Sequence, residues 1–101
     1  MIIRFERTGG FTAIPMRLDL DTDTLEPVEH QNLHGLIETS GFFSLPVRLP
    51  ATSKGSDRFY YKLTVVELNR SHTVESEETS LPENLRPLIQ KLVLLARGPR
   101  S

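Results

Sequence analysis

The stretch IIRFERTGGFTAIPMRLDL, residues 2–20, places two alternating runs on either side of a pair of glycines. In the first run Ile3 and Phe5 alternate with charged residues, and in the second run apolar residues recur at every second position. Alternation with a period of two is typical of half-buried β-strands. The stretch therefore predicts a β-hairpin with strands over residues 2–7 and 12–20 and with TGGF as its turn.

The same alternation predicts which side chains of the hairpin face the protein core. Successive side chains of a strand point to opposite faces, so the apolar positions gather on one side of the hairpin and the charged positions on the other. Pro15 cannot donate a ladder hydrogen bond, which places the second strand at a sheet edge or gives it a bulge. The expected core face carries Ile3, Phe5, Ile14, Met16, Leu18 and Leu20.

A different periodicity indicates a helix over residues 26–40, EPVEHQNLHGLIETS. Thr24 is the expected N-cap, Pro27 falls in the first turn, and Gly41 is suited to end the helix. The expected buried stripe consists of Leu25, Leu33, Leu36 and Ile37, with Val28 near one side.

The segment after this helix, residues 42–57, is long and irregular. Pro46 and Pro50 prevent regular pairing within it, and SKGSD is typical of a turn. A connection of this length is more often functional than a short turn is.

The strongest strand signal lies in RFYYKLTVVE, residues 58–67. After the turn LNR, residues 72–76 are predicted to return as a shorter strand. In the strand over residues 58–67, the expected inward side chains are Phe59, Tyr61, Leu63 and Val65, and the outward ones are Tyr60, Lys62, Thr64 and Val66.

The last element is predicted to be a helix within residues 82–97. Ser80 and Glu83 fit a capping box, and Pro87 is expected to delay the regular helix to about Arg86. The expected buried face carries Leu85, Leu88, Ile89, Leu92, Leu95 and Ala96.

The predicted order of elements is ββαββα, which indicates an α+β fold in one domain over residues 1–101. We expect an antiparallel four-stranded sheet with two helices packed on one face. The opposite, uncovered face would carry the polar alternates: Arg4, Glu6, Arg17, Asp19, Tyr60, Lys62, Thr64, Thr73 and Glu75.

Composition narrows the class of function. The formal net charge is −1 and no basic stripe is present, which argues against a nucleic-acid binder. The chain has no cysteine, so disulfides, thiolate metal sites and cysteine nucleophiles are excluded. No apolar run is long enough for a signal peptide or a membrane span, and we expect a cytoplasmic protein.

Two arrangements of side chains resemble metal sites. Asp19, Asp21 and Asp23 have the spacing that opens a calcium-binding EF-hand, but position six is Thr24 rather than glycine and position twelve is His30 rather than glutamate. A solvated strand end is the better interpretation of these acidic residues.

The second arrangement is a pair of histidines. His30 and His34 are four residues apart on the predicted helix and, with Glu38, could form a weak zinc site. The alternative, which we favour, is two surface histidines, because Gln31 stands where a His-Glu-x-x-His motif needs glutamate. We therefore expect no metal and no cofactor.

The chain also lacks the residues of a catalytic site. No serine lies in a Gly-x-Ser-x-Gly elbow, and TGGFT lacks the lysine of a phosphate-binding loop. A small protein without these arrangements, but with loops at the ends of a sheet, is typical of a binding module rather than an enzyme.

Several strings in combination resemble the emfourin family, the protein inhibitors of thermolysin-like metallopeptidases of the protealysin type. They are IIRFERTGGFTAIPMRLDLDTDTL, GFFSLP, DRFYYKLTV and LPENLRPLIQKL, and the resemblance covers about residues 2–96. It implies a sheet with helices packed on it, and a reversible inhibitor that binds the active-site cleft of a zinc peptidase. The zinc and the catalytic glutamate would belong to that partner. A non-inhibitory adaptor or chaperone for a peptidase is the alternative.

Two loops offer a surface for such a partner. At the hairpin tip the glycines allow close backbone approach and Phe11 offers an apolar anchor, although a simple turn with Phe11 at the core edge is an alternative. In residues 46–57, Val47 and Leu49 suit apolar pockets or else lie under the helices. The expected contacts of this chain, a monomer when free, are Arg7, Thr8, Gly9, Gly10, Phe11, Val47, Arg48, Leu49, Lys54 and Asp57.

Overall fold

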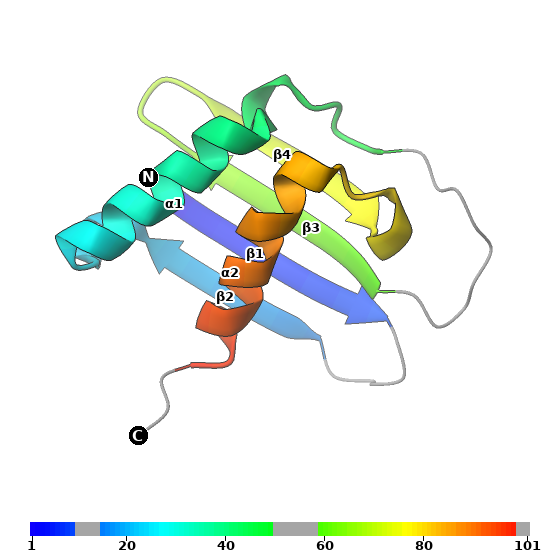
Figure 1. Ribbon diagram of the computed structural model, residues 1–101, viewed down its shortest axis with the longest axis horizontal. Helices are drawn as coiled ribbons and strands as arrows, with labels where there is room; N and C mark the ends of the chain where they lie inside the picture. The colour runs from blue at the N-terminus through cyan, green and yellow to red at the C-terminus, as the bar shows by residue number, and fades with distance from the viewer. Residues whose placement is uncertain (10–14, 50–58, 99–101) are drawn as a thin grey trace.

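The structure, a computed structural model, describes residues 1–9, 15–49 and 59–98. Its sheet has the strand order β2-β1-β3-β4, and every neighbouring pair is antiparallel. Both helices lie across the same face of this sheet, which confirms the predicted α+β architecture (Figure 1). The elements are β1 (Ile2–Gly9), β2 (Met16–Asp21), α1 (Pro27–Ser40), β3 (Phe59–Val66), β4 (Ser71–Glu77) and α2 (Arg86–Ala96).

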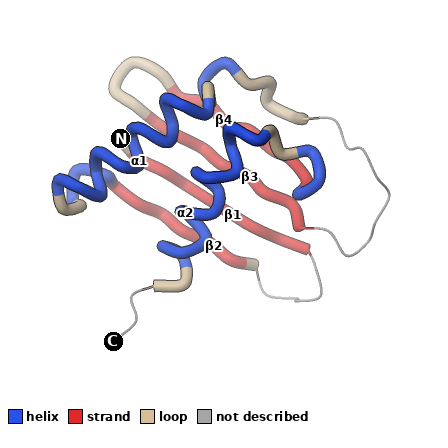
Figure 2. Tube along the Cα trace, in the orientation of Figure 1, coloured by secondary structure: helices blue, strands red, loops and turns tan. Residues whose placement is uncertain are grey.

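The alternation in β1 and β3 decides what fills the space between sheet and helices. Ile3 and Phe5 of β1 are buried beside Val65 and Leu63 of β3, their partners in the antiparallel register. Figure 2 shows the two layers, with the helices in blue over the strands in red. The buried apolar core comprises Ile3, Phe5, Leu33, Ile37, Phe42, Tyr61, Leu63, Val65, Val74, Leu81, Leu85, Leu88, Ile89 and Leu92.

The two long edges of the sheet differ in what lies beside them. β2 is an edge strand that begins directly after Pro15, as the missing donor of proline predicts. Met16, Leu18 and Leu20 pack against the core from this edge, whereas the expected inward residue Ile14 lies outside the described residues. At the outer edge of β4, the chain around Arg48 pairs with Glu75 in an isolated parallel bridge.

The start of α1 differs from the prediction. The N-cap is Glu26, without a side-chain hydrogen bond, and the predicted cap Thr24 lies in a short 3-10 turn over Thr22–Thr24. The carboxylate of Asp21 accepts a hydrogen bond from the N–H of Asp23 at 3.0 Å and so caps that turn instead. The cap prediction was wrong because this acidic residue begins a separate turn before the helix.

α2 begins at Arg86, where Pro87 predicted it. The capping box of Ser80 and Glu83 was wrongly placed, because residue 80 ends one short 3-10 turn and residue 83 begins another. Leu85 occupies the N-cap position of α2 without a side-chain hydrogen bond. A proline in the first turn costs no intrahelical hydrogen bond, because the N–H groups of that turn have no acceptor within the helix. The start of α2 is therefore set by backbone geometry and burial and not by a side-chain cap. Among the described residues, neither helix has the length and apolarity to cross a membrane.

Gly35 within α1 and Gly41, which caps its C-terminus, should change stability in opposite directions when replaced by alanine. Gly41 ends the helix at φ 65°, whereas Gly35 lies exposed in its interior, and a Cβ at either position meets nothing within 4 Å. Gly41→Ala should therefore destabilise the fold by about 1 kcal/mol, and Gly35→Ala should stabilise it by about as much. Urea unfolding of both variants checks the prediction, and equal signs would contradict it.

Candidate functional site

The predicted hairpin tip starts at one end of the sheet. Gly9, the last residue of β1, lies opposite Phe59, the first residue of β3. Gly9 has a φ of 87°, a conformation that glycine adopts at little cost. The predicted contact residues Gly10 and Phe11 lie outside the described residues, so the tip is defined here by the residues that precede it.

Arg7 and Thr8 stand on opposite faces of β1 at this end. Arg7 shares the helix-covered face with Phe5, and its guanidinium lies 4.2 Å from the ring centroid of Phe59. Such a cation–π contact holds the side chain against the protein. Arg7 is therefore half-buried, and its guanidinium is held in one position over Phe59 instead of extending into solvent.

Tyr61 lies beside Arg7, directly opposite it in the register of β1 and β3. Burial raises the pKa of the Tyr61 phenol, and the negative charge of Glu78 raises it further, while Arg7 opposes both. The phenol therefore stays neutral at physiological pH and keeps its proton as a hydrogen-bond donor.

A shallow groove lies between this end of the sheet and α2. Its volume is about 400 Å³ and its lining is mostly apolar. Leu94, on its helical wall, is 61% exposed, which is unusual for a leucine beside a core. The lining consists of Arg7, Tyr61, Ile89, Gln90, Val93 and Leu94.

The second predicted contact, around Val47, is fixed to the edge of β4 by its backbone. The N–H of Glu75 donates to the carbonyl of Val47 at 2.6 Å, and the N–H of Leu49 donates to the carbonyl of Glu75 at 2.9 Å. Leu49 packs against the core, whereas Val47 is 54% exposed. Of the two apolar side chains, only Val47 is well presented to a partner.

Arg48 points to solvent between them, with its guanidinium 3.8 Å from the carboxylate of Glu75. The segment runs parallel to β4, and so it leads toward the end of the sheet that holds Gly9 and Phe59. Three interstrand spacings separate it from β1, about 14 Å. The bridge itself lies level with Glu6 of β1, three residues before Gly9, because Glu75 pairs with Lys62 and Lys62 with Glu6. Lys54 and Asp57 lie outside the described residues.

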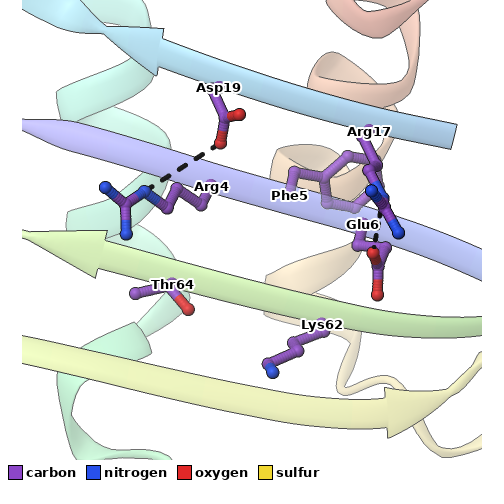
Figure 3. A pocket seen from close by; sticks show the side chains of 7 residues that line it. All are labelled: Arg4, Phe5, Glu6, Arg17, Asp19, Lys62 and Thr64. Atoms are coloured by element: carbon purple, nitrogen blue, oxygen red, sulfur yellow. Dashed lines mark hydrogen bonds and ion pairs between the residues drawn. The ribbon is translucent and has the colours of Figure 1, made fainter.

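The uncovered face of the sheet carries charges whose signs alternate from strand to strand (Figure 3). Arg17 donates to the carboxylate of Glu6 at 2.8 Å, and Lys62 and Glu75 continue the row on β3 and β4. A hollow of about 270 Å³ lies over Glu6, Arg17 and Lys62, with Arg4, Asp19 and Thr64 also lining it. Because opposite charges neutralise one another along the row, this face has no dominant sign with which to attract an ionic substrate.

The histidines that resembled a zinc site form local structural contacts. The rings of His30 and His34 stack with centroids 4.3 Å apart. Nδ1 of His30 lies 2.8 Å from the carbonyl of Thr22, and Nε2 of His34 lies 3.3 Å from the hydroxyl of Thr22. Both histidines thus fasten α1 to the turn before it, and the residues in the described ranges contain no cluster of three or more potential metal ligands.

One exposed residue was missed by the sequence analysis. Leu68, in the turn between β3 and β4, is 98% exposed. The available signal was an apolar residue within ELNR, a turn whose neighbours are all polar. The pattern LNR predicted only a turn at this position.

Comparison of the chain with known proteins finds one matching family. A family model described as Emfourin matches residues 5–93. Among solved structures, Emfourin from Serratia proteamaculans, described as an M4 family peptidase inhibitor, is 20% identical, with a TM-score of 0.48 over 86% of this chain and 83% of that one. No curated protein matches the chain.

Proposed function

This chain belongs to the Emfourin family, and we propose that it inhibits a thermolysin-like zinc metallopeptidase of the protealysin type by blocking its active-site cleft. The observation that carries the proposal is the family match, which spans residues 5–93 of 101 and so includes the sheet except the start of β1, all of α1 and most of α2. The Serratia proteamaculans protein that bears the family name is described as an M4 family peptidase inhibitor.

The sheet end with Gly9 and Phe59 is the part of the molecule that we assign to the cleft. A strand end that carries a positive-φ glycine lets the backbone approach a partner closely, because no Cβ stands in the way. Inhibition would then be steric, with the zinc and the catalytic groups supplied by the peptidase. The proposed contacts are Arg7, Thr8, Gly9, Gly10, Phe11, Val47, Arg48, Leu49, Lys54 and Asp57.

The two arginines have different roles in this proposal, because one is exposed to solvent and the other is held against the protein. Arg48 is largely solvent-exposed and would attract acidic groups at the cleft rim, chiefly raising the rate of association. Arg7 is held over Phe59 and would donate hydrogen bonds from a fixed position. Leu49 would act indirectly, because its packing against the core sets the path of Val47 and Arg48.

The remaining parts of the proposal concern the state of the protein. We propose a monomer when free, without cofactor or catalytic activity of its own, that acts in the cytoplasm on a protein partner. Its net charge of −1 gives no support to binding of nucleic acid or of an anionic membrane surface.

Titration of a purified thermolysin-like peptidase tests this function. With the peptidase well above the dissociation constant and a small peptide as substrate, activity should fall linearly to zero near one equivalent of this protein. The small substrate matters, because a protein bound away from the cleft leaves its hydrolysis intact. Binding by calorimetry without loss of activity would replace the inhibitor with the adaptor, and no binding would remove both for that peptidase.

A further inference from the structure

The segment over residues 45–49 carries Val47 and Arg48, two of the proposed contacts, along the outer edge of β4. In this described segment, both backbone hydrogen bonds to β4 involve Glu75, through the carbonyl of Val47 and the N–H of Leu49. A bridge of one residue fixes a segment at one point and leaves its direction undetermined. A second fastening point is therefore needed to hold Val47 and Arg48 in place.

His72 of β4 supplies the second fastening point. Its Nε2 lies 2.6 Å from the carbonyl of Leu45. Because a carbonyl oxygen can only accept, the hydrogen of this bond is on Nε2 and the imidazole is the donor. The offset between these two residues is 27, the same as between Arg48 and Glu75, so the side chain of His72 continues the parallel register of the bridge.

The ring of His72 is held in place by packing. It lies on the helix-covered face of β4, since its partner in β3 is the buried Val65. The ring centroids of Phe42 and Phe43 lie 5.4 and 6.3 Å from the centroid of the imidazole. Phe42 is fully buried, so the imidazole has little room to turn away from the carbonyl of Leu45.

His72 is too far from the end of β1 to touch a partner bound there. Its partner Val65 pairs with Ile3 of β1, six residues before Gly9. Six residue steps along a strand span about 20 Å. An effect of His72 on a contact at that end of the sheet therefore has to pass through residues 45–49.

We propose that His72 is a positioning residue for inhibition, because its hydrogen bond to Leu45 sets the path of residues 45–49 and so presents Val47 and Arg48 to the target peptidase. The proposal rests on the proposed function, which supplies the partner and these two contacts. A segment held at two points loses less conformational entropy on binding than a segment held at one point. The fastening therefore favours a tight complex without itself touching the partner.

Variants of His72 that keep or remove the donor test this role. His72→Phe keeps an aromatic ring but removes the donor, and it should raise the inhibition constant about tenfold. His72→Gln returns an N–H near the position of Nε2 and should bring the inhibition constant to within about threefold of the wild type. In a chain that already carries Val47→Ala and Arg48→Ala, His72→Phe should change the inhibition constant less than about threefold, because the side chains that His72 positions are gone.

His30→Phe is the matched control. His30 is also half-buried, its ring stacks on that of His34, and its Nδ1 lies 2.8 Å from the carbonyl of Thr22. The substitution removes an equivalent hydrogen bond at the turn before α1, while residues 45–49 keep theirs. It should lower the urea midpoint of unfolding about as much as His72→Phe does, and it should leave the inhibition constant within about threefold of the wild type.

Amide hydrogen exchange adds a measurement that needs no peptidase. The N–H groups of Leu49 and Glu75 form the bridge, and they should exchange at least about threefold faster in His72→Phe than in His30→Phe. Equal exchange rates in the two variants would show that His72 does not fasten the segment, and would overturn the proposal.

The inhibition assay separates the failure of this proposal from the failure of the proposed function. Unchanged inhibition by His72→Phe overturns the positioning role and leaves the inhibitor standing. Equal losses for His72→Phe and His30→Phe assign the effect to stability and overturn it too. The same holds for a loss that His72→Gln does not restore, or that persists in the chain without the side chains of Val47 and Arg48. A wild-type protein that does not inhibit the peptidase overturns both proposals.

Discussion

Replacing Phe42 with alanine is expected to lower the free energy of unfolding by about 3–5 kcal/mol. Phe42 is fully buried and contacts the rings of both Phe43 and His72 at centroid distances of 5.4 Å. Its removal leaves a cavity where α1, the sheet and the segment toward Val47 meet. Because small domains are stable by only about 5–15 kcal/mol, this single change should consume much of the total.

Phe43→Ala is the matched control for this prediction. The two phenylalanines are neighbours in one short 3-10 turn, but Phe43 is only half-buried. Its substitution should cost about 1–2 kcal/mol, including the lost contact with Arg70. Urea unfolding of both variants measures the difference. Equal losses of unfolding free energy in the two variants would show that Phe42 does not anchor the segment toward Val47 to the core more strongly than Phe43 does.

The strands and the helices were predictable because each follows from a local pattern. Alternation in residues 58–67 identified β3 and the inward face of Leu63 and Val65 correctly. Pro87 located the start of α2, because a missing donor is tolerated only in a first turn. The caps were less predictable, since several acidic and hydroxyl residues lie before each helix and compete for the same role.

The contacts of the candidate site were less predictable because they depend on distant parts of the chain. The bridge between Arg48 and Glu75 joins segments 27 residues apart, and no local pattern indicates it. The same holds for Arg7, whose contact with Phe59 depends on the register between β1 and β3. The sequence identified the segments that carry the proposed contacts, but the structure shows which side chains they present.

Gly9→Glu is expected to raise the inhibition constant at least about a hundredfold, if the end of β1 enters the cleft as proposed. Two effects act together. The side chain holds the backbone away from the partner, and its charge loses water in the interface without a partner of its own. A third effect must be separated from these, because a side chain at φ 87° costs about 1–2 kcal/mol of folding free energy.

Gly98→Glu separates the cost of folding from the cost of binding. Gly98 has a φ of 79°, a Cβ there meets nothing within 4 Å, and it lies after α2, beyond the residues that match the family model. The two variants make the same substitution in nearly the same backbone conformation, so their unfolding free energies should fall by similar amounts. Their inhibition constants should differ about a hundredfold, because only Gly9 belongs to the proposed contact. If both variants inhibit as well as the wild type, Gly9 serves only the turn, and the cleft contact must be sought elsewhere on the molecule.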